Sequence, residues 1–225
     1  MAYNYSSFVA ALAAAVEVDP ADADFLAVLP TIVDLAEQRI YRELDLVSSS
    51  VVASGAMTPN SRYATLPTSA GHLVVVEQVN VLDAGNTRHP LKLASRDLID
   101  FIWPSDTALS ASVIPDLFSR VDDTRILVGS APGTAWNFEV VGTIRPAPLS
   151  ASNTTTFLSS YLSDLFFAAA MVAAAGVLLK NYGAQADSPQ QATSWESVYQ
   201  RHFASANAEE LRKQFGAVMS PPVKA

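Results

Sequence analysis

The chain has 225 residues, 50% of them apolar and 16% charged, and its formal net charge at pH 7 is -8. This composition supports a sizeable core and excludes disorder along most of the chain. The acidic balance argues against a surface that binds nucleic acid by neutralising phosphates. The absence of cysteine excludes disulfides, zinc–thiolate centres and thiol nucleophiles, and it fits synthesis in a reducing cytoplasm.

Two apolar segments resemble targeting signals. Residues 8–16 have the character of a signal-peptide core, but no lysine or arginine precedes them, so we predict no secretory signal. Residues 165–179 carry no charge, but they are too few for a bilayer span, which needs about 20. We predict that they form a buried core helix.

The N-terminal third predicts two helices. Ser6 or Ser7 is suited to cap the first, and Asp19-Pro20 to end it. The second runs from about Asp22 to Leu44, where Pro30 either kinks it or begins its second part. Apolar residues at three–four spacing predict its buried face: Leu29, Ile32, Val33, Ala36, Ile40 and Leu44. The opposite, polar face is predicted to carry Asp34, Glu37, Gln38, Arg42 and Asp45.

The middle of the chain, from about Val47 to Ser150, changes to a β pattern. Ser95–Phe101 is predicted as a short helix. Strands are predicted from β-branched runs, turn residues and alternation at residues 73–82, 89–93, 117–121, 125–128 and 136–145. The last of these alternates cleanly between apolar and polar residues, which indicates a strand with one face on a core.

The C-terminal third is helical again. Thr154 or Thr155 is suited to cap a long helix that reaches about Asn181, with Gly183 as its stop. Because its centre is apolar on nearly every side, other helices or other subunits must cover it. A last helix begins near Ser188-Pro189, and its aromatic residues are predicted to lie in the core or in a subunit contact: Trp195, Tyr199 and Phe203.

These elements predict an α+β fold. Residues 1–46 and 151–216 are expected to form one helical bundle, and residues 47–150 an inserted antiparallel β-rich domain. Residues 217–225 are expected to form an extended tail that is disordered in the free monomer.

No residue pattern in the sequence predicts catalysis or metal binding. His72, His89 and His202 are isolated, with no second ligand at helical spacing. The acidic pairs Asp122-Asp123 and Asp97/Asp100 are better explained as turn residues. Asp22 and Asp24 are expected to cap or charge a helix N-terminus, and residues 129–133 to form a plain turn. We therefore predict no catalytic, cofactor-binding or metal-binding residue, and a structural protein rather than an enzyme.

Several motifs together resemble a known family. Asp24–Leu46 contains the pattern DF…LP…AE.RI.RELDL, and Ser61–Pro67 leads into a valine-rich strand. Trp136–Arg145, Pro148–Ser150 and Thr154–Leu158 then precede the Ala-rich helix. This order, over about residues 5–205, is similar to the SU10-type adaptor proteins and the tail-tubular or connector proteins of podoviruses.

The resemblance implies a head-to-tail adaptor in the neck of a tailed-phage particle. Such proteins form rings, commonly dodecamers, between the portal protein and the tail nozzle, tail-tube proteins or tail fibres. DNA would pass through the channel without sequence-specific binding, and neither a cofactor nor a membrane is implied. The tail at residues 217–225 is expected to become ordered when the ring docks on the portal.

Three other functions remain open from the sequence alone. The chain is also compatible with another neck, tail-completion or tail-tube protein of a virion. A second alternative is a ligand-binding or hydrolytic domain with a β-rich insertion, although no convergent polar site is visible. A third is a non-viral oligomeric scaffold.

Overall fold

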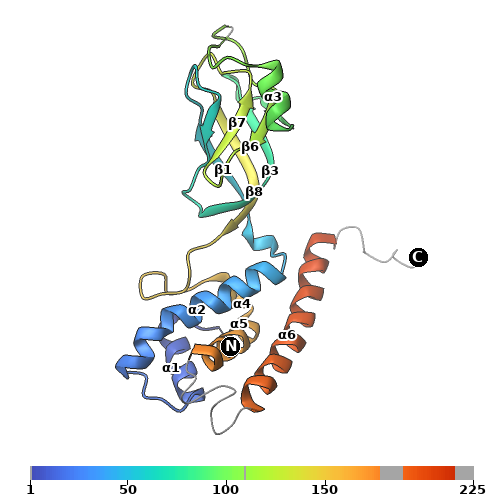
Figure 1. Ribbon diagram of the computed structural model, residues 1–225. Coiled ribbons are helices and arrows are strands. Elements are labelled where there is room, and N and C mark those ends of the chain that lie inside the picture. The colour runs from blue at the N-terminus through green and yellow to red at the C-terminus, as the bar shows by residue number, and fades with distance from the viewer. Residues whose placement is uncertain (1, 109, 178–189, 216–225) are drawn as a thin grey trace, which may run out of the picture. The chain divides into compact units, whose positions relative to one another are not determined.

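The computed structural model describes residues 2–108, 110–177 and 190–215, apart from the side chains of residues 190–193. Helices and mainly antiparallel sheets are both present (Figure 1), in agreement with the predicted α+β class. The chain divides into two compact units. Met1–Ser48 and Ala147–Ala225 form the helical unit, and Ser49–Pro146 forms the β unit.

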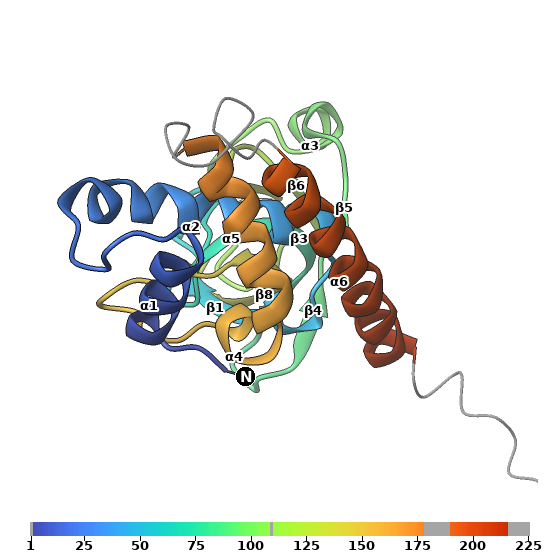
Figure 2. The same ribbon diagram turned by 90° about the horizontal axis from the view of Figure 1, so that it is seen from below.

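The helical unit contains helices from both ends of the chain. They are α1 (Tyr5–Ala15), α2 (Ala23–Glu43), α4 (Phe157–Tyr161), α5 (Ser163–Val177) and α6 (Gln190–Phe215). Helix α5 contacts α1, α2, α4 and α6, and Figure 2 shows it with α1 on one side and α6 on the other. One apolar core therefore joins the two ends of the chain.

Helix α1 begins and ends earlier than predicted. Its N-cap is Asn4, whose side chain accepts a hydrogen bond from the backbone N–H of Ser7 at 2.8 Å. The Ser7 hydroxyl in turn accepts from the backbone N–H of Asn4, which completes a capping box. The predicted Ser6 or Ser7 cap is therefore wrong, because an asparagine upstream satisfies the free N–H groups first. Helix α1 ends at Ala15, before Asp19-Pro20.

Helix α2 confirms the second predicted helix. Asp22 caps it by accepting from the backbone N–H of Phe25 at 2.8 Å, and Asp24 lies in its first turn. Both acids lie where the positive end of the helix dipole favours them, as predicted. Pro30 lies inside the helix, which continues through it.

The predicted long C-terminal helix is divided. Helix α4 begins after Thr156, not Thr154 or Thr155, and its capping box pairs Thr156 with Ser159. Leu162 ends α4 in a non-helical conformation, and α5 follows at once from Ser163. The predicted boundaries at Asn181, Gly183 and Ser188-Pro189, and the tail at residues 217–225, lie outside the described residues.

Helix α5 is buried by helices of its own chain. Its buried residues are Ser163, Leu165, Phe166, Ala168, Ala169, Ala170, Met171, Ala174 and Ala175. The rings of Phe8 and Phe166 stack with their centroids 4.6 Å apart. Since α5 is already covered within the chain, its apolar surface does not by itself require a neighbouring subunit.

The strands of the β unit form two four-stranded sheets within the described residues, in the orders β1-β8-β3-β4 and β2-β7-β6-β5. The strands are β1 (Ser50–Ala56), β2 (Tyr63–Thr65), β3 (His72–Leu82), β4 (Arg88–Pro90), β5 (Lys92–Leu93), β6 (Leu117–Arg120), β7 (Arg125–Gly129) and β8 (Asn137–Arg145); a short 3-10 turn, η1 (Val47–Ser49), precedes β1. The strands predicted at residues 73–82 and 117–121 are confirmed as β3 and β6, and each forms an antiparallel pair with the strand that follows it, β4 and β7. Strands β1 and β2 were not predicted, and the β5–β6 pair is parallel rather than antiparallel.

The two sheets share one apolar core. Phe138 and Val140 of β8 face Phe118 of β6 and Val128 of β7 across it, and the alternation predicted for residues 136–145 is confirmed. Helix α3 (Arg96–Ile102), capped by Ser95, contacts β6 and β7. It lies on the outer face of the second sheet, because Gly129 of β7, which lies against Ile99, alternates with Val128, which points into the shared core.

Candidate interaction surfaces

The three histidines lie in separate places. His72 is exposed at the start of β3. The His89 Nε2 atom lies 3.1 Å from an oxygen of Asp83, and the His202 Nδ1 atom lies 3.0 Å from an oxygen of Asp164. Across residues 2–108, 110–177 and 190–215, no group of three or more metal-ligating side chains is present. The geometry therefore builds no metal centre from the described residues.

The two acidic pairs have different roles. Asp122 accepts hydrogen bonds from the backbone N–H and the hydroxyl of Thr124, at 2.8 and 2.7 Å. These bonds and the nearby Arg125 hold the pKa of Asp122 well below its usual range. The predicted turn role is confirmed for Asp122. It is wrong for Asp97 and Asp100, because both lie within helix α3, where Asp100 accepts a hydrogen bond from Arg62.

Arg62 anchors α3 and the segment after it, a role that the sequence did not predict. Its guanidinium donates to Asp106 at 2.8 Å, to Asp100 at 2.9 Å and to the carbonyl of Trp103. The side chain is only 10% exposed, and these bonds raise its pKa further. A buried guanidinium with three acceptors fixes the position of α3 on the β unit.

In the helical unit, Arg39 joins α2 to α6. Two of its nitrogens donate to the two carboxylate oxygens of Glu196, at 2.8 and 2.6 Å. Its guanidinium also lies over the ring of Tyr199, 3.8 Å from the centroid, and the Tyr199 hydroxyl donates to Glu43 at 2.6 Å. The fork lowers the pKa of Glu196 to about 2. This arrangement stabilises the contact between the two helices, and Tyr199 lies in the core as predicted.

Glu37 lies in the core, whereas the helical pattern predicted it on the polar face of α2. It is 3% exposed and accepts a hydrogen bond from the backbone N–H of Leu149 at 3.1 Å. Burial raises its pKa to about 7. The buried hydroxyl of Tyr41 has no hydrogen-bond partner among the described residues, and burial raises its pKa too.

One open hollow of about 220 Å³ lies in the helical unit. It is lined by Tyr3, Ser163, Asp164, Phe167, Trp195, Val198 and His202. Tyr3, Phe167 and Trp195 form its aromatic walls, and Asp164 and His202 contact each other.

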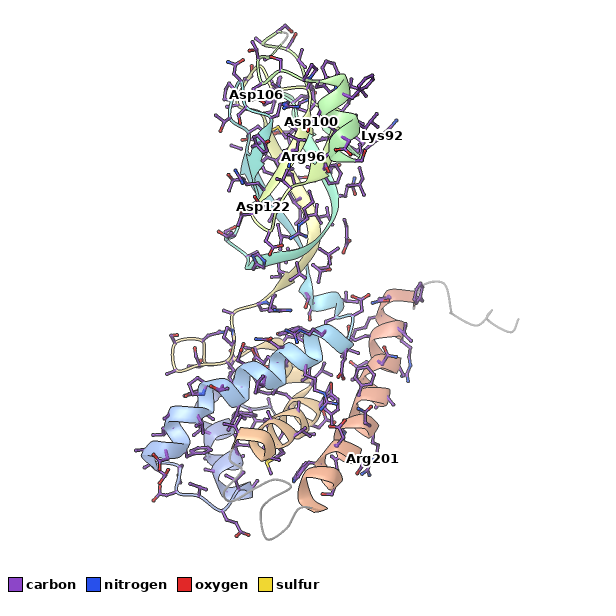
Figure 3. The ribbon with its side chains drawn as sticks, viewed as in Figure 1. Lys92, Arg96, Asp100, Asp106, Asp122 and Arg201 are labelled. Carbon is purple, nitrogen blue, oxygen red and sulfur yellow. The ribbon has the colours of Figure 1, made fainter. Side chains whose placement is uncertain are left out.

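The β unit exposes large apolar side chains in two areas. The first, which we call the α3 patch, consists of Leu98, Phe101 and Ile102. Figure 3 shows the charged residues Lys92, Arg96 and Asp100 beside it. The second, which we call the valine face, consists of the exposed Val52 and Val75 and the half-buried Val141. Surfaces of this kind are typical of protein contacts.

Comparison with protein families then decides the identity. The family model described as SU10 adaptor protein matches residues 3–222. The chain belongs to the SU10 adaptor protein family. No curated protein matches the sequence.

Membership in the SU10 adaptor family confirms the resemblance in Asp24–Leu46 and the motifs after it. The family consists of structural phage proteins. Its members therefore interact with other head and tail proteins of the phage. Within its described residues, no helix has the length and apolar character needed to cross a bilayer.

Proposed function

We propose that this adaptor forms a ring in the virion neck, between the portal protein and the tail. The ring would seal the filled head and offer a docking surface to tail nozzle or tail-tube proteins and to tail fibres. The observation that carries this proposal is the family match over residues 3–222. A ring of identical subunits, about twelve by resemblance, requires heterologous contacts that close.

In the proposed architecture, the two chain ends form one bundle and residues 47–150 are an inserted domain. Packing of α2 and α6 against α5 supports the bundle, as does the clamp between Arg39 and Glu196. We propose that the helical bundle surrounds the DNA channel and that the β unit faces the tail.

The charge of the chain suits a channel that lets DNA pass. The first 38 residues contain six acidic side chains and no basic one. Acidic side chains at a channel wall would repel phosphates, so DNA would slide through without being held and without sequence-specific binding. This proposal includes neither catalysis nor a cofactor.

Electron microscopy of the purified chain, alone and mixed with the portal protein of the same phage, tests the ring. We expect closed rings on the tail-proximal end of the portal. Particles in which the chain is bound elsewhere, or a portal that the chain does not bind, would contradict the proposal.

The C-terminal tail gives a second test. We propose that residues 217–225 dock on the portal, so a chain that lacks them should keep its circular dichroism spectrum but bind the portal poorly. Portal binding by the truncated chain at the level of the intact chain would contradict this part of the proposal.

A further inference from the structure

Strand β1 forms a free edge of the first sheet. It pairs only with β8, because the strand order of this sheet is β1-β8-β3-β4. The register between the two strands is continuous over all seven residues of Ser50–Ala56. The strand contains no proline and no charged residue. It therefore lacks the bulge, the proline and the charge that proteins use to stop an edge strand from pairing with another strand.

The direction of the hydrogen bonds shows which backbone groups of β1 point away from β8. Just after the strand, the Met57 N–H donates to the Trp136 carbonyl at 2.8 Å. Residues that bond the neighbouring strand alternate with residues that do not, so Val51, Ala53 and Gly55 bond β8. The other four residues, which we call the outward set, are Ser50, Val52, Ser54 and Ala56. In the part of the chain that the structure describes, the N–H and C=O groups of its last three members make no hydrogen bond.

The side chains of the outward set are accessible as well. All four are exposed on the outer face of the sheet, whereas Ala53 between them is buried. Val52 is the largest of the four and is 64% exposed. A strand that is added at this edge would therefore meet unbound backbone groups and small, uncharged side chains.

The other three edges of the two described sheets are closed. Strand β4 has three residues and ends at Pro90, which has no N–H to donate. In β2, Arg62 bonds β7, so Tyr63 points away from it, and the Ser61 hydroxyl binds both the N–H and the carbonyl of Tyr63 at 3.2 Å. Strand β5 has only two residues, and one of them is the charged Lys92. Among these edges, β1 alone can accept a further strand.

We propose that β1 of one copy pairs with β1 of a second copy, antiparallel and about a two-fold axis at Ala53. In this register, Val52 lies opposite Ser54 of the second copy, and Ser50 lies opposite Ala56 of the second copy. Each member of the outward set then meets another member of the same set. The N–H and C=O groups of Val52 and Ser54 all gain hydrogen bonds, and the two first sheets become one continuous sheet.

The shape and the charge of the edge select a second copy as the occupant. On the core side of the strand, the half-buried Val51 would lie opposite Gly55 of the second copy, where the missing side chain leaves room for it. The ring of Phe138 already lies within 2.7 Å of the place where a Cβ on Gly55 would be. Residues 49–146 carry nine acidic and seven basic side chains, so two β units are nearly neutral to each other.

The proposed pair is separate from the proposed ring. A two-fold contact ends with two copies, whereas a ring requires heterologous contacts. The pair is therefore a form of the free chain, in which each copy closes the edge of the other and keeps it from pairing with further chains. Failure of the ring would leave the pair standing, and failure of the pair would leave the ring standing.

The absence of cysteine from the chain allows a disulfide test. Val52→Cys in one copy and Ser54→Cys in the other would lie directly opposite, with the Cα atoms about 5.5 Å apart, which suits a disulfide. Both positions are exposed, so both variants should fold. A single strand edge buries less than a standard interface of about 1,600 Å², so the pairing is expected to be weak, and the disulfide traps it.

In a glutathione redox buffer, the mixture of Val52→Cys and Ser54→Cys should give a disulfide-linked heterodimer. Its yield should exceed that of either variant alone by about tenfold, because each cysteine lies about 7–8 Å from its own counterpart, too far for a bond. Val75→Cys is the matched control, because Val75 is an exposed valine of the same sheet, on β3 and away from the edge. Equal yields from Val75→Cys and Val52→Cys, or homodimers as abundant as the heterodimer, would overturn the proposal.

Hydrogen exchange, followed by NMR at single residues, tests the backbone contact in the wild-type chain. Exchange of the Val52 and Ser54 amides should slow by at least about twofold between dilute and concentrated protein. The Ala53 amide, which bonds β8, should be protected at every concentration. Val52→Pro removes an outward N–H without removing a bond to β8, so it should abolish the concentration dependence at Ser54. Val52→Thr keeps the N–H and the shape of the side chain and should leave it unchanged.

Two results of the exchange experiment would contradict the pairing of two copies. One is exchange at Val52 and Ser54 that does not change with concentration. The other is protection of these amides only after the portal or a tail protein is added, which would mean that a strand of another protein occupies the edge.

Discussion

The helical unit and the β unit bury their apolar side chains in different ways. In the helical unit, α5 is the most apolar element, and helices of the same chain cover it. In the β unit, the shared core is filled by one face of each sheet, while both outer faces keep exposed apolar residues. The helical unit also leaves large apolar side chains exposed, Tyr161 and Phe215 among them. The difference therefore lies in how each core is built: helices from both ends of the chain surround one apolar helix in the helical unit, whereas two sheets share one apolar layer in the β unit.

The largest expected effect compares two phenylalanines. Phe166→Ala in the helical core should lower the free energy of unfolding by about 3–5 kcal/mol, because it removes a buried ring and leaves a cavity. Phe101→Ala in the α3 patch should change it by less than about 0.5 kcal/mol, because that ring is exposed. Urea unfolding followed by circular dichroism measures both. A large loss from Phe101→Ala would mean that the patch is part of a core.

A second prediction concerns pH and the one buried carboxyl group of α2. The pKa of Glu37 rises from 4.5 to about 7 on folding, so the folded chain keeps a proton that the unfolded chain loses. Stability from this group is complete below pH 4.5 and falls by about 3 kcal/mol as the pH rises through about 7.

Glu37→Gln keeps an acceptor for the Leu149 N–H and cannot ionise. The variant should therefore gain stability relative to the wild type between those pH values, and the difference should level off above pH 7. Unfolding curves at several pH values measure it. Because Glu196 has a lowered pKa, its own contribution runs the other way and is lost as the pH falls below its usual range. A constant difference between wild type and Glu37→Gln would contradict the raised pKa.

A smaller effect is expected at the α2–α6 clamp. Tyr199→Phe removes the hydroxyl that donates to Glu43 but keeps the ring beneath Arg39. It should lower the free energy of unfolding by about 1 kcal/mol. No change would mean that the hydroxyl bonds water equally well in the folded chain.

The smallest effect distinguishes the observed cap of α1 from the predicted one. Asn4→Ala removes the acceptor for the Ser7 N–H and should cost about 1 kcal/mol or slightly less. Ser6→Ala should cost only a few tenths, because Ser6 caps no backbone group. Thermal unfolding of both variants gives the comparison, and equal losses would favour the predicted serine cap.

Local sequence patterns correctly predicted the helices and strands that have a clear periodicity of their own. The face predicted from three–four spacing in α2 and the alternation predicted in β8 were both correct. Strand β1 was missed because most of its residues are serine, glycine and alanine, which carry little β propensity, and β2 because it is only three residues long. They are strands because β8 and β7 pair with them.

The residues described for the candidate surfaces were also hard to predict, because they too depend on distant segments of the chain. Arg62, Arg39 and Glu37 have their partners far along the chain, so no spacing in the sequence reveals them. Glu37 lies one turn after Val33 and one before Ile40–Tyr41, at the margin of the apolar face, and its partner Leu149 is more than a hundred residues away along the chain.

The sequence by itself determined the α+β class, the family and the lack of a recognisable catalytic pattern. These depend on composition, on local periodicity and on an order of motifs that one chain carries along its length. The tertiary structure decided that α5 is covered from within, that Glu37 is buried, and that the α3 patch and the valine face lie on opposite sides of one sandwich. Burial and facing depend on which distant segments meet, and sequence spacing does not encode that.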